Sequence, residues 1–227
     1  QHVEVTPACT ENYFKYVIGA LAHDSMQGRL PGTIQEKQSA QFIAREFCKT
    51  GCPPLNKKQY CYPFEFKNAD SSITNSNGNV IARLDTKSKY IIVITAHYDH
   101  IGKGDHHSND PFSHQIHNGA DDNASGVAML LGLAAWCNEH RKELKYDFIF
   151  AALSGEEDGL LGAQHFLNSG IVDTSKIICN INFDMVGHLD LLRPLVLLDA
   201  ALLFPTWDSI LPFDSTAAFL VQRKTNV

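Results

Sequence analysis

The chain has 227 residues, of which 44% are hydrophobic and 19% are charged, and its formal net charge is −6. This length and apolar fraction suit one globular domain with a sizeable hydrophobic core. The negative charge, without a basic stripe to neutralise phosphates, argues against a nucleic-acid-binding protein. No apolar run approaches the roughly 20 residues that a membrane-spanning helix needs, so we expect no transmembrane segment.

The N-terminal part of the chain shows helical spacing of its apolar residues over 11–22 and 34–48. Glycine and proline in the intervening "HDSMQGRLPGT" (23–33) indicate a loop. Residues 49–79 are expected to be irregular and polar. No internal repeat or low-complexity tract interrupts this part of the chain.

Three of the six cysteines, Cys48, Cys52 and Cys61, lie close together in a stretch that also contains prolines. A local disulfide among them is one possibility, and it would indicate an oxidising compartment. The chain begins at Gln1 rather than Met, for which a cleaved signal peptide is one explanation and a trimmed sequence is another. We therefore expect a secreted or periplasmic location.

From residue 79 onward, β-rich runs alternate with helical stretches. The expected strands are 79–84, 90–99, 146–157 and 176–187, and the expected helices are 125–140 and 160–168. This alternation, with nearly continuous apolar runs, is typical of parallel strands that are covered on both faces. We predict an α/β fold with a mostly parallel or mixed central sheet, helices on both faces, and a single domain over 1–227.

Each of the last three predicted strands ends in acidic residues or a histidine, within "AHYDH" (96–100), "SGEED" (154–158) and "NFDMVG" (182–187). A further acidic loop, "NGADDNASG" (118–126), leads into a helix. Ligands of open parallel sheets gather beyond the carboxyl ends of the strands. We therefore expect one cluster that contains His97, Asp99, Asp121, Asp122, Glu156, Glu157 and Asp184.

Such a cluster of carboxylates needs a positive countercharge. One histidine with several carboxylates suits a zinc-type ion better than calcium, which prefers oxygen ligands alone. The acids are too many for one tetrahedral ion, so two metals that share a carboxylate fit better. Taken singly, His97 reads as a core histidine and Asp121–Asp122 as a helix N-cap with its neighbour. Their joint placement at consecutive strand ends favours the metal site.

The motifs "AHYDHIG", "GADDNASGVA", "SGEEDGLLGA" and "NFDMVG", in this order, resemble the M28 family of zinc aminopeptidases. With "MQGRLPGT" and "QSAQFIAREF" upstream, the resemblance covers about residues 15–188. It implies a zinc-exopeptidase-like fold and a metal-dependent aminopeptidase that acts on peptides with a free N-terminus.

The resemblance also implies roles for single residues. Asp121 would bridge two zinc ions, His97 and Asp184 would bind one of them, and Glu157 would bind the other. A zinc-bound hydroxide would attack the peptide, with Glu156 as the general base. Asp99 would orient His97 from outside the metal's ligand shell. The peptide bond Asp121–Asp122 is expected to be cis.

Residues 189–227 depart from the family pattern and read as a degraded or incomplete C-terminal part. The family's remaining zinc ligand, a histidine, has no matching residue here. We therefore expect an incomplete shell, and weaker occupancy, for the zinc held by Glu157. The loop 100–119 carries five histidines, including His100, and we interpret it as a rim loop rather than as a third metal site.

Three rival functions share this architecture. A glutaminyl cyclase would use a single zinc, but its loop departs from "GADDNASG". A carboxypeptidase would need a basic residue for the substrate carboxylate, and the matched motifs supply none. A catalytically impaired binding module would be expected to lose ligands, whereas Glu156 and four ligand positions persist here.

Overall fold

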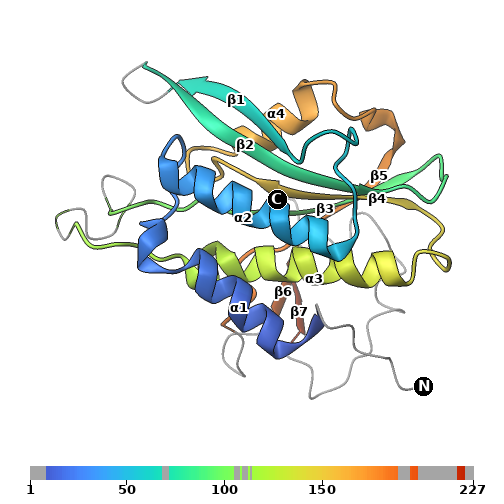
Figure 1. Ribbon diagram of the computed structural model, residues 1–227, viewed down its shortest axis with the longest axis horizontal. Helices are drawn as coiled ribbons and strands as arrows, with labels where there is room; N and C mark the ends of the chain where they lie inside the picture. Colours follow the sequence, from blue (N-terminus) through green and yellow to red (C-terminus); the bar gives the residue numbers. More distant parts are fainter. Residues whose placement is uncertain are drawn as a thin grey trace. The chain divides into compact units, whose positions relative to one another are not determined.

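The computed structural model describes residues 9–67, 72–104, 108, 112, 114–188, 195–198 and 219–222 (Figure 1). The chain divides into two compact units, Gln1–Met185 and Val186–Val227. In the second unit, the described strands β6 (Leu195–Leu198) and β7 (Phe219–Gln222) pair in parallel. The rest of the segment expected to be degraded lies outside the described residues, and the expectation of a single domain stays a prediction.

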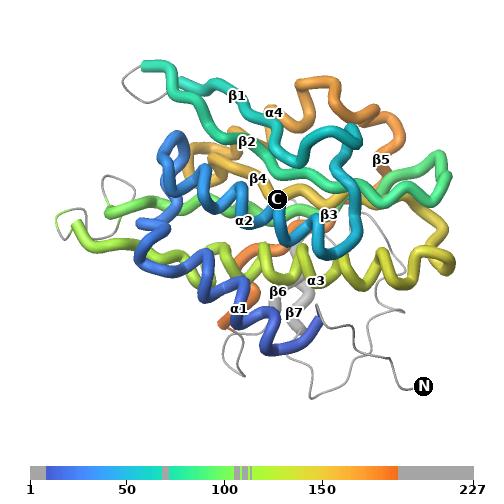
Figure 2. Tube along the Cα trace, in the orientation of Figure 1, coloured from blue at the N-terminus to red at the C-terminus, as the bar shows by residue number. Residues whose placement is uncertain are grey.

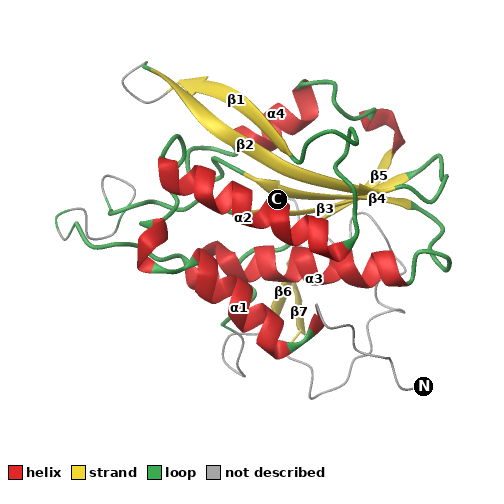
Figure 3. Ribbon diagram, in the orientation of Figure 1, coloured by secondary structure: helices red, strands yellow, loops and turns green. Residues whose placement is uncertain are grey.

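The first unit is built on a five-stranded sheet in the order β1-β2-β4-β3-β5 (Figure 3). Its strands are β1 (Cys61–Lys67), β2 (Ile73–Leu84), β3 (Ile91–His97), β4 (Asp147–Leu153) and β5 (Ile177–Asn182). Strand β3 runs parallel to both β4 and β5, and β2 runs antiparallel to β1 and β4. The predicted α/β class with a mixed sheet is therefore confirmed.

Helices cover both faces of this sheet (Figure 2). Helices α1 (Glu11–Leu21), α2 (Ile34–Thr50) and α3 (Gly126–Glu139) pack on one face, and α4 (Leu161–Asn168) packs on the other. All four begin and end within two residues of the helices predicted from the sequence. In α2, the side chain of Thr33 accepts a hydrogen bond from the amide of Glu36, and Gly51 ends the helix in a left-handed conformation.

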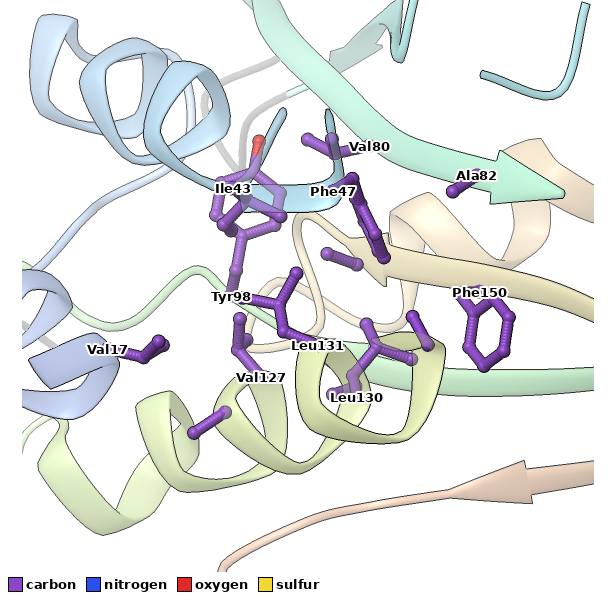
Figure 4. Packing of buried hydrophobic residues seen from close by; sticks show 14 of the residues in the cluster. Val17, Ile43, Phe47, Val80, Ala82, Tyr98, Val127, Leu130, Leu131 and Phe150 are labelled. Atoms are coloured by element: carbon purple, nitrogen blue, oxygen red, sulfur yellow. The ribbon is translucent and has the colours of Figure 1, made fainter. Parts of the chain in front are cut away.

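Alternate residues of each strand point to opposite faces of the sheet. Those on one face pack against α1, α2 and α3 and form the larger core. Phe47 of α2 and Leu131 of α3 meet Val80 of β2 and Phe150 of β4 in this layer (Figure 4). The other face of the same strands forms a second cluster with Phe166 of α4. The sheet is thus buried on both sides and forms a rigid base for the loops at its carboxyl edge.

Strand β1 and the first half of β2 fall within residues 49–79, which were expected to be irregular, so that expectation is wrong. Pro63 lies inside β1, and the register of the β1–β2 pair shifts between Tyr62 and Phe64. Proline is tolerated in such a position because β1 is an edge strand and the bulge releases one amide from the ladder. Proline and polar residues hide this strand in the sequence.

All six cysteines are free, so the local disulfide considered for Cys48, Cys52 and Cys61 does not form. Cys52 is buried, and its thiol lies 3.4 Å from the carbonyl oxygen of Ala134 on α3. Burial raises the pKa of this thiol to about 11. The extracytoplasmic location consequently has no support from disulfides and stays a prediction. Among the described helices, none combines the length and apolar character needed to cross a membrane.

The buried face of α3 provides a test of the core. Leu130 is fully buried, whereas its neighbour Met129 is 36% exposed. We expect Leu130→Ala to lower the free energy of unfolding by about 2–5 kcal/mol, since it removes buried methyl groups and leaves a cavity. The control Met129→Ala should change it by less than about 1 kcal/mol. Urea unfolding followed by circular dichroism measures both, and equal losses would contradict the assigned packing.

Candidate metal centre

The strand ends bring the acidic motifs together around β3, which lies between β4 and β5. His97 is the last residue of β3 and pairs with Leu153, so Glu156 and Glu157 follow β4 at the same edge. Thr95 pairs with Asn182, which places Asp184 level with His97 on the other side. The convergence expected from the parallel strands is therefore present.

The first group of possible metal ligands is His97, Asp122 and Asp184. The Nε2 atom of His97 lies 3.2 Å from Oδ1 of Asp122 and 3.4 Å from Oδ1 of Asp184. Zinc–ligand bonds of about 2.0 Å in a tetrahedral arrangement would place ligand atoms about 3.3 Å apart. The spacing of these three side chains thus fits one zinc ion.

The second group is His100, Asp122 and Glu157. The Nδ1 atom of His100 lies 2.7 Å from Oε1 of Glu157 and 4.0 Å from Oδ2 of Asp122. Asp122 therefore belongs to both groups and turns one carboxylate oxygen toward each histidine. This is the arrangement that a bridging carboxylate between two metal ions requires.

Asp121, which the sequence placed at the bridging position, belongs to neither group among the described residues. Its backbone carbonyl accepts a hydrogen bond of 2.7 Å from the hydroxyl of Ser125. The non-helical backbone of Asp122 and Asn123 kinks this turn and directs Asp122 toward His97. The structure therefore moves the shared position by one residue, from Asp121 to Asp122.

The cis peptide bond shows the same shift. It joins Asp122 and Asn123, so the prediction of a cis bond between Asp121 and Asp122 is wrong. Asp121 and Asp122 are adjacent, so their distances along the sequence to each of the other motifs differ by only one residue. The sequence pattern therefore does not decide which of them faces the histidines.

Glu156 and Glu157 are held apart by the turn after β4. Gly155 adopts a left-handed conformation with φ of 71° and bends the chain there. The carboxylate of the buried Asp99 then accepts the amides of Glu156 at 3.2 Å and Glu157 at 3.3 Å. Glu157 consequently contacts His100, whereas Glu156 lines a neighbouring pocket with His97.

Asp99 was expected to orient His97, and the two side chains do face each other. Oδ1 of Asp99 lies 3.7 Å from Nδ1 of His97, which is longer than a hydrogen bond. The Nδ1 atom is buried and has no hydrogen-bond partner among the residues that the structure describes. The shorter contacts of Asp99 fix the backbone of the two glutamates, a role that sequence reasoning missed.

The centre carries a strong negative field. Burial alone would lower the pKa of His97, but the neighbouring carboxylates of Asp122, Asp184 and Asp99 raise it to about 12. Burial also raises the pKa of Glu156 above its usual value, although His97 opposes this effect. Without another cation, a proton on His97 has to balance the acids. The donor set, its spacing and this surplus of negative charge together fit bound zinc.

A buried arginine, Arg29, ties together the loops that carry the centre. Its guanidinium donates hydrogen bonds to the backbone carbonyls of Leu21 and Tyr98 at 2.7 Å, Asn118 at 2.6 Å and Gly119 at 2.9 Å. Burial lowers the pKa of Arg29 to about 10, and Asp99, Asp122 and Glu157 oppose this decrease. In the sequence it is one arginine in a glycine- and proline-rich loop, which gave no signal of its own.

A pocket of about 390 Å³ opens beside the first group. Its polar end contains His97 and Glu156. Its remaining lining is largely apolar and comes from β3, β4, β5 and α4 with its N-cap, with Val93, Leu153, Leu160, Ala163, Phe166, Leu167 and Ile177. A bound molecule could therefore place a polar group at the centre and an apolar group in the pocket.

Comparison with known proteins supports the motif assignments. The family model described as Peptidase family M28 matches residues 79–194, just over half of the chain. The alkaline phosphatase isozyme conversion protein of Escherichia coli (strain K12) is 31% identical over 167 residues, which cover 70% of this chain and 48% of that protein. Aminopeptidase YwaD of Bacillus subtilis (strain 168) is 34% identical over 98 residues, 43% of this chain and 18% of that protein. The chain thus spans about half or less of the length of these relatives.

Solved structures share the fold. A leucine aminopeptidase precursor from Bacteroides thetaiotaomicron superposes with a TM-score of 0.72 at 18% identity, over 99% of this chain and 80% of that one. A Zn-dependent exopeptidase from Parabacteroides distasonis superposes with a TM-score of 0.67 at 20% sequence identity, over 82% of this chain and 64% of that one. The glutaminyl cyclase of Porphyromonas gingivalis superposes with a TM-score of 0.66 at 21% sequence identity, over 82% of this chain and 63% of that one. The predicted family is confirmed by the family model, and the predicted zinc-exopeptidase-like fold by these structures.

Arg29 allows a test of how the centre is held. Arg29→Met would leave four carbonyls without their donor, two of them buried and two partly buried, so we expect the free energy of unfolding to fall by at least about 3 kcal/mol. Arg45→Met, at an exposed position on α2, should change it by no more than about 0.5 kcal/mol. Urea denaturation measures both variants. Wild-type stability of Arg29→Met would contradict the view that Arg29 holds these loops together.

Proposed function

Because the chain belongs to peptidase family M28, we propose that it is an aminopeptidase, which hydrolyses the first peptide bond of peptides that have a free N-terminus. The observation that carries this proposal is the position of Asp122 between two groups of metal ligands. A shared carboxylate is a feature of two-metal hydrolytic sites. Glu156 lies beside these groups without belonging to either of them.

The residues of the two groups would hold the ions. His97, Asp122 and Asp184 would bind one zinc ion, and Asp122 and Glu157 would bind the other. Bound zinc supplies Lewis-acid polarisation of a carbonyl oxygen and makes a water acidic enough to lose its proton near neutral pH. The assignment differs from the sequence expectation only in the bridging residue, Asp122 in place of Asp121.

Glu156 is the group best placed to move protons. Its side chain lines the pocket next to His97, so a peptide bound there would have its scissile bond close to the carboxylate. As general base it would accept a proton from the attacking water, and it would then donate that proton to the departing amine. Asp99 would act as a positioning residue, since it holds the amides of Glu156 and Glu157.

The same negative field would select the end of the peptide. A free α-amine is cationic at neutral pH and is attracted to a site lined by carboxylates. Asp184 is 44% exposed and Asp122 is 33% exposed, so both remain open to an entering molecule. The carboxylates of the centre would attract the amine of the first residue and place the first peptide bond near Glu156.

The pocket would receive the side chain of that first residue. Its lining is largely apolar and includes Leu160, Phe166 and Ile177, so leucine-like side chains would gain most from burial there. One of the proteins with a similar fold is a leucine aminopeptidase precursor. We therefore extend the proposal to a preference for apolar N-terminal residues.

Glutaminyl cyclase activity is the alternative, because proteins of that activity share the fold. A single-zinc enzyme would have no use for the second group with its shared carboxylate. The two activities give different products from a peptide that begins with glutamine. A cyclase closes the N-terminal residue into a ring and leaves the peptide bond intact, whereas an aminopeptidase releases free glutamine.

The catalytic role of Glu156 leads to the first prediction. With zinc supplied, the chain should release p-nitroaniline from leucyl-p-nitroanilide. Glu156→Ala should lower kcat by at least about 100-fold while zinc stays bound, because it removes the general base and no ligand. Glu143→Ala, at an exposed position, should keep wild-type turnover. Unchanged activity of Glu156→Ala, or its loss together with zinc, would refute this role.

The pocket leads to a second prediction. Ala163 lies on α4 and lines the pocket, so Ala163→Phe should fill part of it. We expect kcat/KM for leucyl-p-nitroanilide to fall at least about 10-fold relative to the alanyl substrate. Asn168→Phe adds the same ring at an exposed position of α4 outside the pocket lining and should leave this ratio unchanged. An equal effect of both variants would contradict the assignment of the pocket.

A further inference from the structure

His100 lies at the metal centre, although the sequence interpretation placed it in a rim loop. Its side chain is only 11% exposed. The Nδ1 atom lies 2.7 Å from Glu157 and 4.0 Å from Asp122, the two residues expected to hold the second ion. The signal in the sequence was the second histidine of "AHYDH", three residues after His97 at the end of a buried strand.

The surrounding backbone holds His100 in this position. Arg29 donates hydrogen bonds to the carbonyl of Tyr98, two residues before His100, and to the carbonyl of Gly119. Gly119 leaves space for the imidazole, since a Cβ atom at that position would lie 2.8 Å from Cδ2 of His100. The tyrosine ring of Tyr98 is buried in the core. The loop is thus built to direct His100 toward Glu157.

The two groups have the same chemical composition. Each contains one histidine and one carboxylate of its own, His97 with Asp184 and His100 with Glu157, and both share Asp122. One histidine with two carboxylates is a donor set that suits zinc. Oδ1 of Asp122 is near His97, and Oδ2 is nearer to His100. Each ion would therefore have three protein ligands from the described residues.

We infer that His100 is a ligand of the second metal ion, together with Glu157 and Asp122. This inference rests on the proposed two-metal function and completes the group for which the sequence offered no histidine. The competing interpretation is a hydrogen-bonded pair of His100 and Glu157 without a metal, since 2.7 Å is also a normal hydrogen-bond distance. Metal binding measured without substrate separates the two.

The experiment uses the metal-free chain, which is titrated with Zn²⁺ in a calorimeter. The wild-type chain should bind two ions. In His100→Ala and His100→Gln, one ion should bind as in the wild type and the other at least about 100-fold more weakly, because loss of an outer-shell partner alone costs 10–100-fold. Glu157→Ala should weaken the same ion. His114→Asn replaces an exposed histidine of the same loop with a residue that tolerates its positive φ, and should bind both ions normally.

Two results would overturn the inference. One is binding of both ions by the His100 variants at wild-type affinity while Glu157→Ala loses one of them. The other is a wild-type chain that binds a single ion. Circular dichroism identifies a variant that fails to fold, and His100→Gln keeps most of the side-chain volume for that case. Two bound ions without any peptidase activity would refute the proposed function and leave the role of His100 intact.

Discussion

Two buried charged residues from one short segment hold the loops on which the centre depends. Arg29 donates hydrogen bonds to the backbone carbonyls of Tyr98, Asn118 and Gly119. Glu36, at the start of α2, accepts the hydroxyl of Ser154 at 2.6 Å and that of Tyr98 at 3.3 Å. The ends of β3 and β4 and the acidic loop are thereby tied to the segment 29–36, which lies outside the sheet. Both groups are fully buried, so each contact forms in a low-dielectric environment where loss of a partner is costly.

This framework explains how so many acids share one edge. Like charges at adjacent strand ends repel, and each carboxylate needs a donor or a cation. Asp99 is satisfied by two backbone amides, so it adds negative charge to the centre without requiring a metal of its own. Asp122, Glu157 and Asp184 instead face the two histidines. The protein thus supplies backbone donors to the inner acid and leaves the outer acids for positively charged partners.

The sequence predicted the elements and the edge at which the motifs meet, because hydrophobic periodicity and strand order determine both. It did not predict features that change when the path of a loop shifts by one residue. The kink at Asp122 decides that this residue, rather than Asp121, faces His97. The hydrogen bonds of Arg29 and the orientation of the His100 side chain depend on contacts between segments far apart in the chain. Strand β1 escaped prediction because its pattern is broken by a proline at a bulge.

The two groups of ligands differ in a way that affects how they would bind metal. In the first group, the two carboxylate oxygens lie 3.2 and 3.4 Å from Nε2 of His97, close to the spacing of ligands around zinc. In the second group they are 2.7 and 4.0 Å, so an ion would first have to separate His100 from Glu157. That separation breaks a hydrogen bond between His100 and the Glu157 carboxylate, so the second ion would be bound more weakly. The sequence predicted weaker occupancy of the second site because no histidine matched the remaining ligand. The structure gives a different reason for weaker binding there, because the metal competes with the hydrogen bond between His100 and Glu157.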